Sequence, residues 1–205
     1  DAIVRIVDEN PGEIDIVAIG PLTNIATAVA LDRELPHKAR SLWIMGGCEN
    51  SVGNITAAAE YNFYVDPEAA QLVLAAGFDT TIVTWTLTLE RALWAHEQLR
   101  ELHDLGTPLA EFFSILDAPN LEFNRSVGID GSTHPDSLTA MLLMRPDLIT
   151  ASRELYVEVD TRPGLTRGYS LMDDRPERHA PNARVIDDID AEGFFQAYRE
   201  LLASD

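Results

Sequence analysis

Short apolar runs alternate along this chain with segments that read as helices. Apolar and β-branched residues predominate in three runs of strand length, which are IDIVAIG (14–20), SLWIMGG (41–47) and DTTIVTWTLT (79–88). Such runs are typical of strands that are covered on both faces. Between two of them, DPEAAQLVLAAG (66–77) reads as a helix with a proline in its first turn and a glycine at its end. The alternation predicts an α/β fold with a mostly parallel sheet flanked by helices.

The rest of the chain continues this pattern without an internal repeat or a linker, so we expect one domain over residues 1–205. The strands near 14–19, 41–46 and 79–85 should be adjacent in the sheet. The polar segment DDRPERHAPN (173–182) reads as a surface loop. The other expected helices are 2–8, 89–104, 107–124, 135–146 and the amphipathic segment near the C-terminus, and the expected strands of the tail include 154–160, RGYSLMDD and ARVIDDID.

Charge and cysteine content narrow the classes of partner. The net charge is −19 over 205 residues, which argues against nucleic acid and anionic membrane surfaces because their phosphates would be repelled. No apolar run approaches the ~20 residues of a membrane span. Cys48 is the single cysteine, which excludes an intramolecular disulfide and a cysteine-based zinc site. We therefore expect a reducing compartment, namely the cytoplasm.

The polar residues most suggestive of a site lie in GNITAAAEYNFYVDPEAA (53–70), which otherwise reads as core. In parallel α/β sheets, ligands bind beyond the carboxyl ends of the strands, and this segment follows the second predicted strand. Asn54, Glu60 and Asn62 supply two amides and one carboxylate, which together can hold several hydroxyl groups, as a sugar requires. The alternative is that Asn54 caps a helix while Glu60 and Asn62 lie on a solvated face.

Several ordered motifs carry a resemblance to a known family. The first three motifs are, in chain order, GPLTNIATA, WIMGG and GNITAAAEYNFYVDPEAA. They are followed by HPDSLTAMLLMRPDL, LTRGYSLMD and NARVIDDIDAEGFF. Together they resemble the inosine–uridine preferring nucleoside hydrolases. The resemblance implies a Rossmann-like core and an enzyme that cleaves the N-glycosidic bond of ribonucleosides to ribose and free base. It also implies a bound calcium ion and a homo-oligomer, either a dimer or a tetramer.

The resemblance also implies roles for individual side chains. Asn54, Glu60 and Asn62 match positions that hold the ribose hydroxyls, and Met45 matches a methionine that lines the same pocket. Tyr61 is a candidate aromatic contact for the leaving base. Trp85 and Trp94 are further candidates, although each of these three aromatic side chains is more often part of the core than of a ligand site.

For calcium, the resemblance implies the backbone carbonyl of Ile19 and the carboxylate of Asp136, and oxygen ligands of this kind suit the ion. Asp136 matches the aspartate of the family's HDP motif, which is written HPD here. Pro135 therefore occupies the position of the family's histidine, a candidate general acid. His134, one residue upstream, is either that acid or an ordinary loop histidine.

One expected element is missing from these 205 residues. The family carries an aspartate cluster of the form DxDxGxDD, which supplies most calcium ligands and the base that activates water, and the sequence contains no such cluster. We therefore expect the chain to correspond to the C-terminal part of a hydrolase domain, and to be inactive and poorly soluble when isolated. The main alternative is a catalytically inactive ribose-binding, nucleoside-binding or assembly module. An unrelated α/β sugar-binding domain is a second alternative.

Overall fold

The computed structural model describes residues 1–175 and 179–204. The chain divides into two compact units, and the loop predicted at 173–182 lies partly outside the described residues. The first unit comprises residues 1–87 and 151–187, and the second comprises 88–150 and 188–205. The expectation of one domain stays a prediction.

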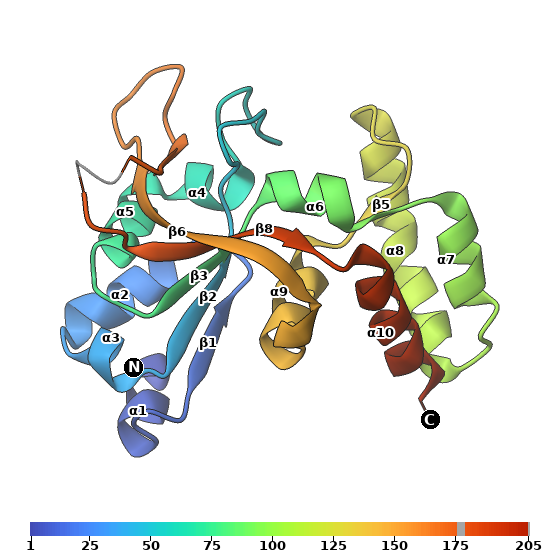
Figure 1. The fold of residues 1–205 in the computed structure, drawn as a ribbon, viewed down its shortest axis with the longest axis horizontal. Coiled ribbons are helices and arrows are strands. Elements are labelled where there is room, and N and C mark those ends of the chain that lie inside the picture. The colour runs from blue at the N-terminus through green and yellow to red at the C-terminus, as the bar shows by residue number, and fades with distance from the viewer. Residues whose placement is uncertain (176–178, 205) are drawn as a thin grey trace. The chain divides into compact units, whose positions relative to one another are not determined.

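A six-stranded sheet runs through the first unit (Figure 1). Its strands, in spatial order, are β1 (Asp15–Ala18), β2 (Ser41–Met45), β3 (Thr80–Val83), β8 (Ala183–Ile189), β6 (Ile149–Val159) and β7 (Ser170–Asp173). β1, β2, β3 and β8 pair in parallel, and β6 pairs with β7 antiparallel. The predicted parallel sheet and the adjacency of the first three strands are therefore confirmed.

The helices of the first unit are amphipathic or small-residue segments that cover this sheet. They are α1 (Ala2–Glu9), α2 (Thr23–Leu31), α3 (Leu35–Lys38), α4 (Tyr61–Val65), α5 (Pro67–Leu74) and the start of α6 (Trp85–Arg91). One apolar cluster joins strand residues such as Ile44 and Ile82 to helix residues such as Phe63 and Val73. Burial of these side chains supplies the main favourable term in folding.

A hydrogen bond joins two of the sequence motifs within this unit. The hydroxyl of Thr23, in GPLTN, donates to the Asp66 carboxylate, in DPEAA, at 2.5 Å. The other oxygen of Asp66 accepts the backbone N–H of Ala69 and so caps the N-terminus of α5. This contact fixes α2 against α5 and helps to define the chain path on either side of β2.

The prediction that the third strand reaches residue 88 is wrong, because the strand ends at Val83 and α6 begins at Trp85. The Thr84 hydroxyl accepts the backbone N–H of Leu87 at 3.1 Å, as a residue that caps a helix does. This bond stabilises a helical turn although TWTLT is rich in β-branched residues. Tertiary context has overridden local strand preference here.

Helices predominate in the second unit, with one two-stranded ribbon in which β4 (Leu93–Trp94) pairs antiparallel with β5 (Ser132–Thr133). The single helix predicted over 89–104 is therefore interrupted. The helices assigned in this unit are α7 (His96–His103), α8 (Pro108–Ser126), α9 (Pro135–Met144), the short 3-10 helix η1 (Pro146–Leu148) and α10 (Ala191–Ala203). In the described part of the chain, no helix is long and apolar enough to cross a membrane.

Candidate functional site

The candidate site is built on the loop of residues 46–60, which connects β2 to α4 at the carboxyl end of β2. Two glycines make its path possible. Gly47 has a positive φ of 72°, which disfavours other residues. A Cβ at Gly53 would lie 1.9 Å from the carbonyl oxygen of Ala59, so only glycine permits this close approach of the two arms of the loop.

Glu60 closes the loop from inside the protein. Its side chain is buried, with the residue only 1% exposed. One carboxylate oxygen accepts the backbone N–H groups of Gly47 at 3.0 Å and of Phe63 at 3.2 Å, and the other accepts that of Asn62 at 2.8 Å. Glu60 therefore caps the N-terminus of α4 and holds the beginning of the loop to its end. Charge-assisted bonds of this kind offset the cost of burying a carboxylate.

Asn62 connects this cap to the end of β2. Its side-chain amide donates to the Met45 carbonyl at 3.1 Å, and the Met45 sulfur lies 3.2 Å from the same nitrogen. Asn62 and Met45 are both buried. The structure therefore brings Met45, Glu60 and Asn62 together, and the alternative in which Glu60 and Asn62 lie on a solvated face is wrong.

Asn54 and Tyr61 lie on the outer side of the same loop. Asn54 is exposed, and its side-chain oxygen accepts the backbone N–H of Tyr61, the first residue of α4, at 2.7 Å. The capping role considered for Asn54 thus has a counterpart in the structure. Tyr61 is half exposed, which leaves its ring open to solvent beside the buried cluster.

Ile19, the expected source of a calcium-binding carbonyl, follows directly after β1. The last paired position of β1 and β2 joins Ala18 to Ile44, so Ile19 leaves the sheet at the same edge as Met45. Its side chain is half exposed. This edge also begins the loop of the candidate site, in agreement with the rule that ligands bind beyond the carboxyl ends of parallel strands.

The other two expected residues, His134 and Asp136, belong to the second unit. Asp136 lies in the first turn of α9 and is exposed, although neighbouring protein atoms partly desolvate its carboxylate and raise its pKa. Glu60 belongs to the first unit, so the second unit by itself does not give the distance between Asp136 and Glu60. The convergence of Asp136 with Asn54, Glu60 and Asn62 on one cleft stays a prediction.

His134 packs in an aromatic cluster of the second unit. Its ring centroid lies 3.9 Å from that of Trp94, 5.6 Å from Phe113 and 6.1 Å from Tyr198. Burial lowers the pKa of the imidazole to about 3, because removal from water disfavours the charged ring. The nearest carboxylate oxygen belongs to Asp117, 3.9 Å from Nε2, beyond hydrogen-bonding distance. The imidazole of this cluster is therefore neutral at pH 7.

The two tryptophans considered as base contacts are both buried. Trp94 is 2% exposed and lies at the centre of the aromatic cluster of the second unit, where Phe194 and Phe195 also contact it. Trp85 is 8% exposed and begins α6. In this structure both behave as core side chains, which leaves Tyr61 as the aromatic ring of the candidate site that is open to solvent.

The described residues do not by themselves form a calcium site. Calcium normally takes about 6–8 oxygen ligands, and residues 1–175 and 179–204 include no group of three or more histidine, cysteine, aspartate or glutamate side chains that could hold a metal ion. Ile19 and Asp136 are two expected ligands, one from each unit. A complete coordination shell needs additional oxygen atoms.

The polar contacts that hold the start of the loop were not predicted. Ser170 bonds both the N–H and the carbonyl of Cys48, and Arg153 pairs with Glu49. These partners lie more than 100 positions apart in the chain. A single sequence carries no periodicity or motif that would signal such a pairing.

Comparison with known proteins shows the family of this chain. The family described as inosine-uridine preferring nucleoside hydrolase matches residues 1–196. The chain belongs to this family. Pyrimidine-specific ribonucleoside hydrolase RihA of Citrobacter koseri is 34% identical over 198 residues, which cover 95% of this chain and 62% of that protein. Uridine nucleosidase 1 of Arabidopsis thaliana is 36% identical over 168 residues, 82% of this chain and 49% of that protein.

Among solved structures, the plant nucleoside hydrolase PpNRh1 is similar to the whole of this chain, with a TM-score of 0.92 and 28% identity. The match covers 66% of that nucleoside hydrolase. An inosine-guanosine nucleoside hydrolase gives a TM-score of 0.88 at 26% identity. The expected fold class of this nucleoside hydrolase family member is thus confirmed, and the chain spans about half to two thirds of the length of its curated relatives.

Proposed function

We propose that the protein is a ribonucleoside hydrolase, which cleaves the N-glycosidic bond to give ribose and a free purine or pyrimidine base. The observation that carries the proposal is the buried cluster of Met45, Glu60 and Asn62 at the carboxyl end of β2. It places a carboxylate and a side-chain amide at one edge of the sheet, within a family whose members are named for this reaction.

We propose a division of roles among the loop residues. Asn54 and Tyr61 are open to solvent and can contact a ribonucleoside directly. Glu60 and Asn62 are enclosed and orient the loop, and we propose that with Asn54 they hold the ribose hydroxyls, so that the Glu60 carboxylate contributes negative charge near the sugar. Breaking the bond to the base builds positive charge on the ribose, and a fixed negative charge stabilises such a transition state.

The test is an assay of base release by the full-length protein from uridine, cytidine, inosine and adenosine. We expect turnover of at least one of them. Because the proposed contacts are to the ribose hydroxyls, the matching 2′-deoxyribonucleoside should lose at least about tenfold in kcat/KM, as sites built for a hydroxyl reject its absence strongly. Equal turnover of ribo- and deoxyribonucleosides would contradict a site built on hydroxyl contacts.

We also propose calcium as the metal, with the Ile19 carbonyl and the Asp136 carboxylate among its ligands. The support is the ligand chemistry, since calcium prefers carboxylate and carbonyl oxygens. Asp136→Asn keeps the size of the side chain and removes its charge, so it should weaken calcium binding in a titration and leave the unfolding temperature unchanged. Asp130→Asn, at an aspartate whose side chain is 95% exposed in the same unit, is the matched control. Equal calcium affinity of the two variants would remove Asp136 from the metal shell.

The general acid is a separate role, which the second unit would have to supply. The sequence suggests His134, but the buried and neutral imidazole described above counts against proton donation, since a group with a pKa near 3 carries no proton to give at pH 7. The proton-donor role of His134 stays a prediction. A loss of turnover in His134→Phe that is largest at low pH, where the ring is protonated, and shrinks as pH rises would support it.

The second candidate function is a non-catalytic module that binds ribose or a nucleoside. It is favoured by the lack, among the described residues, of a group of side chains that could hold a metal ion. Isothermal titration with uridine and with ribose distinguishes the two functions, because the module would bind these ligands while no base is released.

A free and buried Cys48 supports the cytoplasm as the proposed compartment, and light scattering would test the proposed homo-oligomer.

A further inference from the structure

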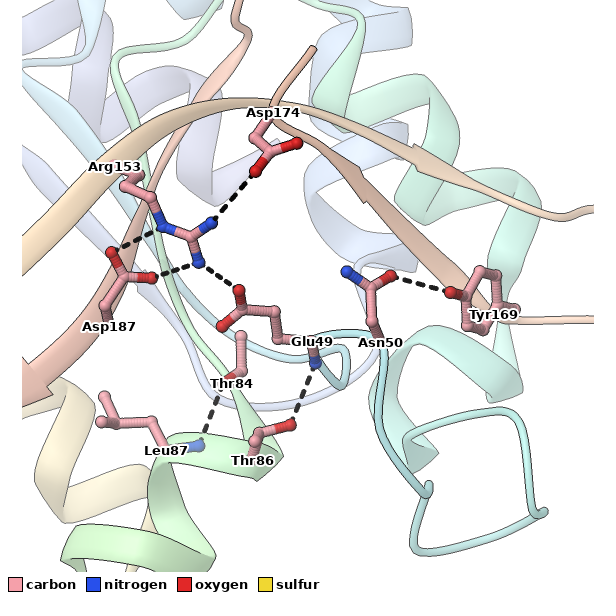
Figure 2. A network of polar contacts seen from close by, with 9 residues as sticks. All are labelled: Glu49, Asn50, Thr84, Thr86, Leu87, Arg153, Tyr169, Asp174 and Asp187. Atoms are coloured by element: carbon pink, nitrogen blue, oxygen red, sulfur yellow. Dashed lines mark hydrogen bonds and ion pairs between the residues drawn. The ribbon is translucent and has the colours of Figure 1, made fainter.

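The start of the 46–60 loop is held by side chains from three different elements of the first unit. The hydroxyl of Ser170, in β7, bonds the N–H and the carbonyl of Cys48 at 3.0 and 3.1 Å. The N–H of Glu49 donates to the hydroxyl of Thr86, in α6, at 3.0 Å. Three consecutive loop residues, 48 to 50, are therefore tied to the rest of the unit by separate contacts, and Figure 2 shows those at Glu49 and Asn50.

Arg153, in β6, makes the charged contact of this set. Its guanidinium binds both carboxylate oxygens of Asp187, in β8, at 2.7 and 2.9 Å. The same group donates to the Glu49 carboxylate, and Asp174 lies 3.8 Å away on the other side (Figure 2). The bidentate bond to Asp187 fixes the plane of the guanidinium, so the nitrogen that reaches Glu49 is held in one direction.

Asn50 is the residue that turns the loop away from this anchor. It is the only non-glycine residue of the described chain with a positive φ, at 46°, a conformation that asparagine adopts more readily than most residues. Its side-chain oxygen accepts the hydroxyl of Tyr169 at 2.8 Å. Two residues later Val52 is 67% exposed, and Ile55 is 46% exposed. The outer part of the loop therefore begins at Asn50 and is open to solvent.

We propose that Arg153 is a positioning residue, which acts through Glu49, together with Tyr169 acting through Asn50, to fix the direction in which the loop presents Asn54. At the far end of the loop, the Asn54 side chain accepts the N–H of Tyr61, and Glu60 ties this end back to Gly47. Asn54 lies between the two attachments and is exposed. The consequence for substrate rests on the proposed function, whereas the anchoring itself does not.

Amide hydrogen exchange in the full-length protein tests the anchoring. Arg153→Met removes the guanidinium and keeps an apolar stem, and Tyr169→Phe removes only the hydroxyl. We expect amides of residues 49–56 to exchange about tenfold faster in each variant, since local opening there becomes easier. Arg153→Lys should give an intermediate rate, because an ammonium keeps the charge and cannot bridge Asp187 and Glu49 as a fork does.

Arg162→Met is the matched control. Arg162 forms a similar fork with Asp160 in the same unit, at 2.8 and 3.0 Å. The Arg162 side chain takes no part in the contacts of residues 48–50, and the variant keeps Asp160, whose backbone N–H donates to the Tyr169 carbonyl. In Arg162→Met, the amides of residues 49–56 should exchange at the same rate as in the wild type. Equal exchange of Arg153→Met and Arg162→Met in this segment would overturn the proposal, whether or not the protein is an enzyme.

Kinetics on the best ribonucleoside of the panel test the consequence for the substrate. A displaced Asn54 weakens binding in the ground state and the transition state alike, so we expect KM to rise about tenfold in Arg153→Met with kcat changed less than about twofold. Faster exchange without a change in KM would overturn the positioning role. A wild-type protein that neither binds nor cleaves ribonucleosides would refute the proposed function, and the exchange comparison would then decide the anchoring alone.

Discussion

At the scale of single residues, Glu60 shows how a charged side chain can occupy a core. It is almost completely enclosed, yet three backbone N–H groups point at its two oxygens. Two of these groups lie at the N-terminus of α4, where the first amides of a helix have no partner within the helix. The carboxylate therefore serves the fold at the position where the family resemblance places a sugar contact.

Glu60→Gln separates these two roles. One oxygen becomes an NH₂ group, which faces a backbone N–H and leaves a buried donor without an acceptor. We expect the free energy of unfolding to fall by about 1–3 kcal/mol, the usual cost of such a loss, and turnover to fall as well. Urea unfolding measures the first effect. Glu13→Gln, at an exposed glutamate, should stay within about 0.5 kcal/mol of the wild type, and equal values for both variants would contradict the capping role.

His134 makes stability depend on pH. In the unfolded chain its pKa is about 6.5, and in the folded protein burial lowers it to about 3. Below pH 6.5 the unfolded chain therefore binds a proton that the folded protein does not. The contribution of the buried neutral ring is fully present above pH 6.5 and is lost as pH falls toward 3, by up to about 1.4 kcal/mol per pH unit. Asp117 and Tyr198 are the titratable groups near the ring.

His134→Phe tests this dependence, because phenylalanine fills the aromatic cluster and does not titrate. We expect the variant to gain stability relative to the wild type as pH falls from 7.5 to 4, measured as the difference in unfolding free energy between the two proteins. The difference at pH 7.5 serves as the reference, since His134 is neutral there in both the folded and unfolded states. A difference that is constant from pH 7.5 to 4 would show that the ring is not buried as described.

The sequence draws attention to three polar residues of the loop, and it does not reveal the backbone contacts that the structure gives them. Asn54, Glu60 and Asn62 stand out because amides and a carboxylate interrupt an apolar segment. Their partners are backbone groups whose positions depend on the turn at Gly47 and on the close approach at Gly53. Contacts of that kind follow from the three-dimensional path of the loop, which no local pattern in the sequence encodes.

At the scale of elements, α8 buries polar side chains. Asp117, Asn120 and Asn124 recur at helical spacing and face the segment around β5. The Asn124 side chain donates to the Gly131 carbonyl at 2.9 Å and to the Thr133 hydroxyl at 3.3 Å. On other positions of α8, Phe112 and Phe123 are about 60% exposed. Polar residues therefore attach this helix to β5, against the usual pattern of apolar burial.

Asn124→Ala should destabilise the second unit. It removes the donor of two buried acceptors, and we expect the free energy of unfolding to fall by about 1–3 kcal/mol. Chemical unfolding, followed with a spectroscopic probe near Trp94 in the same unit, measures this free energy. Ser126→Ala, which removes one exposed hydrogen bond to Phe123, is the control and should change stability by less than about 0.5 kcal/mol. Equal effects of both variants would show that the polar face of α8 does not hold β5.

At the scale of the whole molecule, the parallel sheet was predictable because β1, β2 and β3 are short apolar runs separated by helical segments. The division of the chain into two units was not predictable in this way. β8 returns to the sheet beside β3, about 100 positions after it, and the second unit is formed by residues 88–150 of the segment in between together with residues 188–205. Local sequence patterns specify single helices and strands. The return of a distant strand such as β8 to the sheet depends instead on which apolar faces remain to be covered.

The number of oxygen ligands that calcium needs leads to a prediction for a polypeptide made of residues 1–205. The carbonyl of Ile19 and the carboxylate of Asp136 are the two protein ligands that the family resemblance assigns. Calcium takes about 6–8 oxygens, and the described residues include no group of three or more side chains of the kinds that hold metals. We therefore expect the polypeptide to bind calcium weakly, and to release no base from uridine or inosine with calcium present.

Isothermal titration with calcium and an assay of base release measure the two parts of this prediction. RihA of Citrobacter koseri, of which this chain matches 62%, serves as the positive control in the same assay. Circular dichroism must first show that the polypeptide is folded, so that a lack of turnover reflects missing ligands. Calcium-dependent turnover at the level of RihA would overturn the prediction, because it would require a base and a metal shell within residues 1–205.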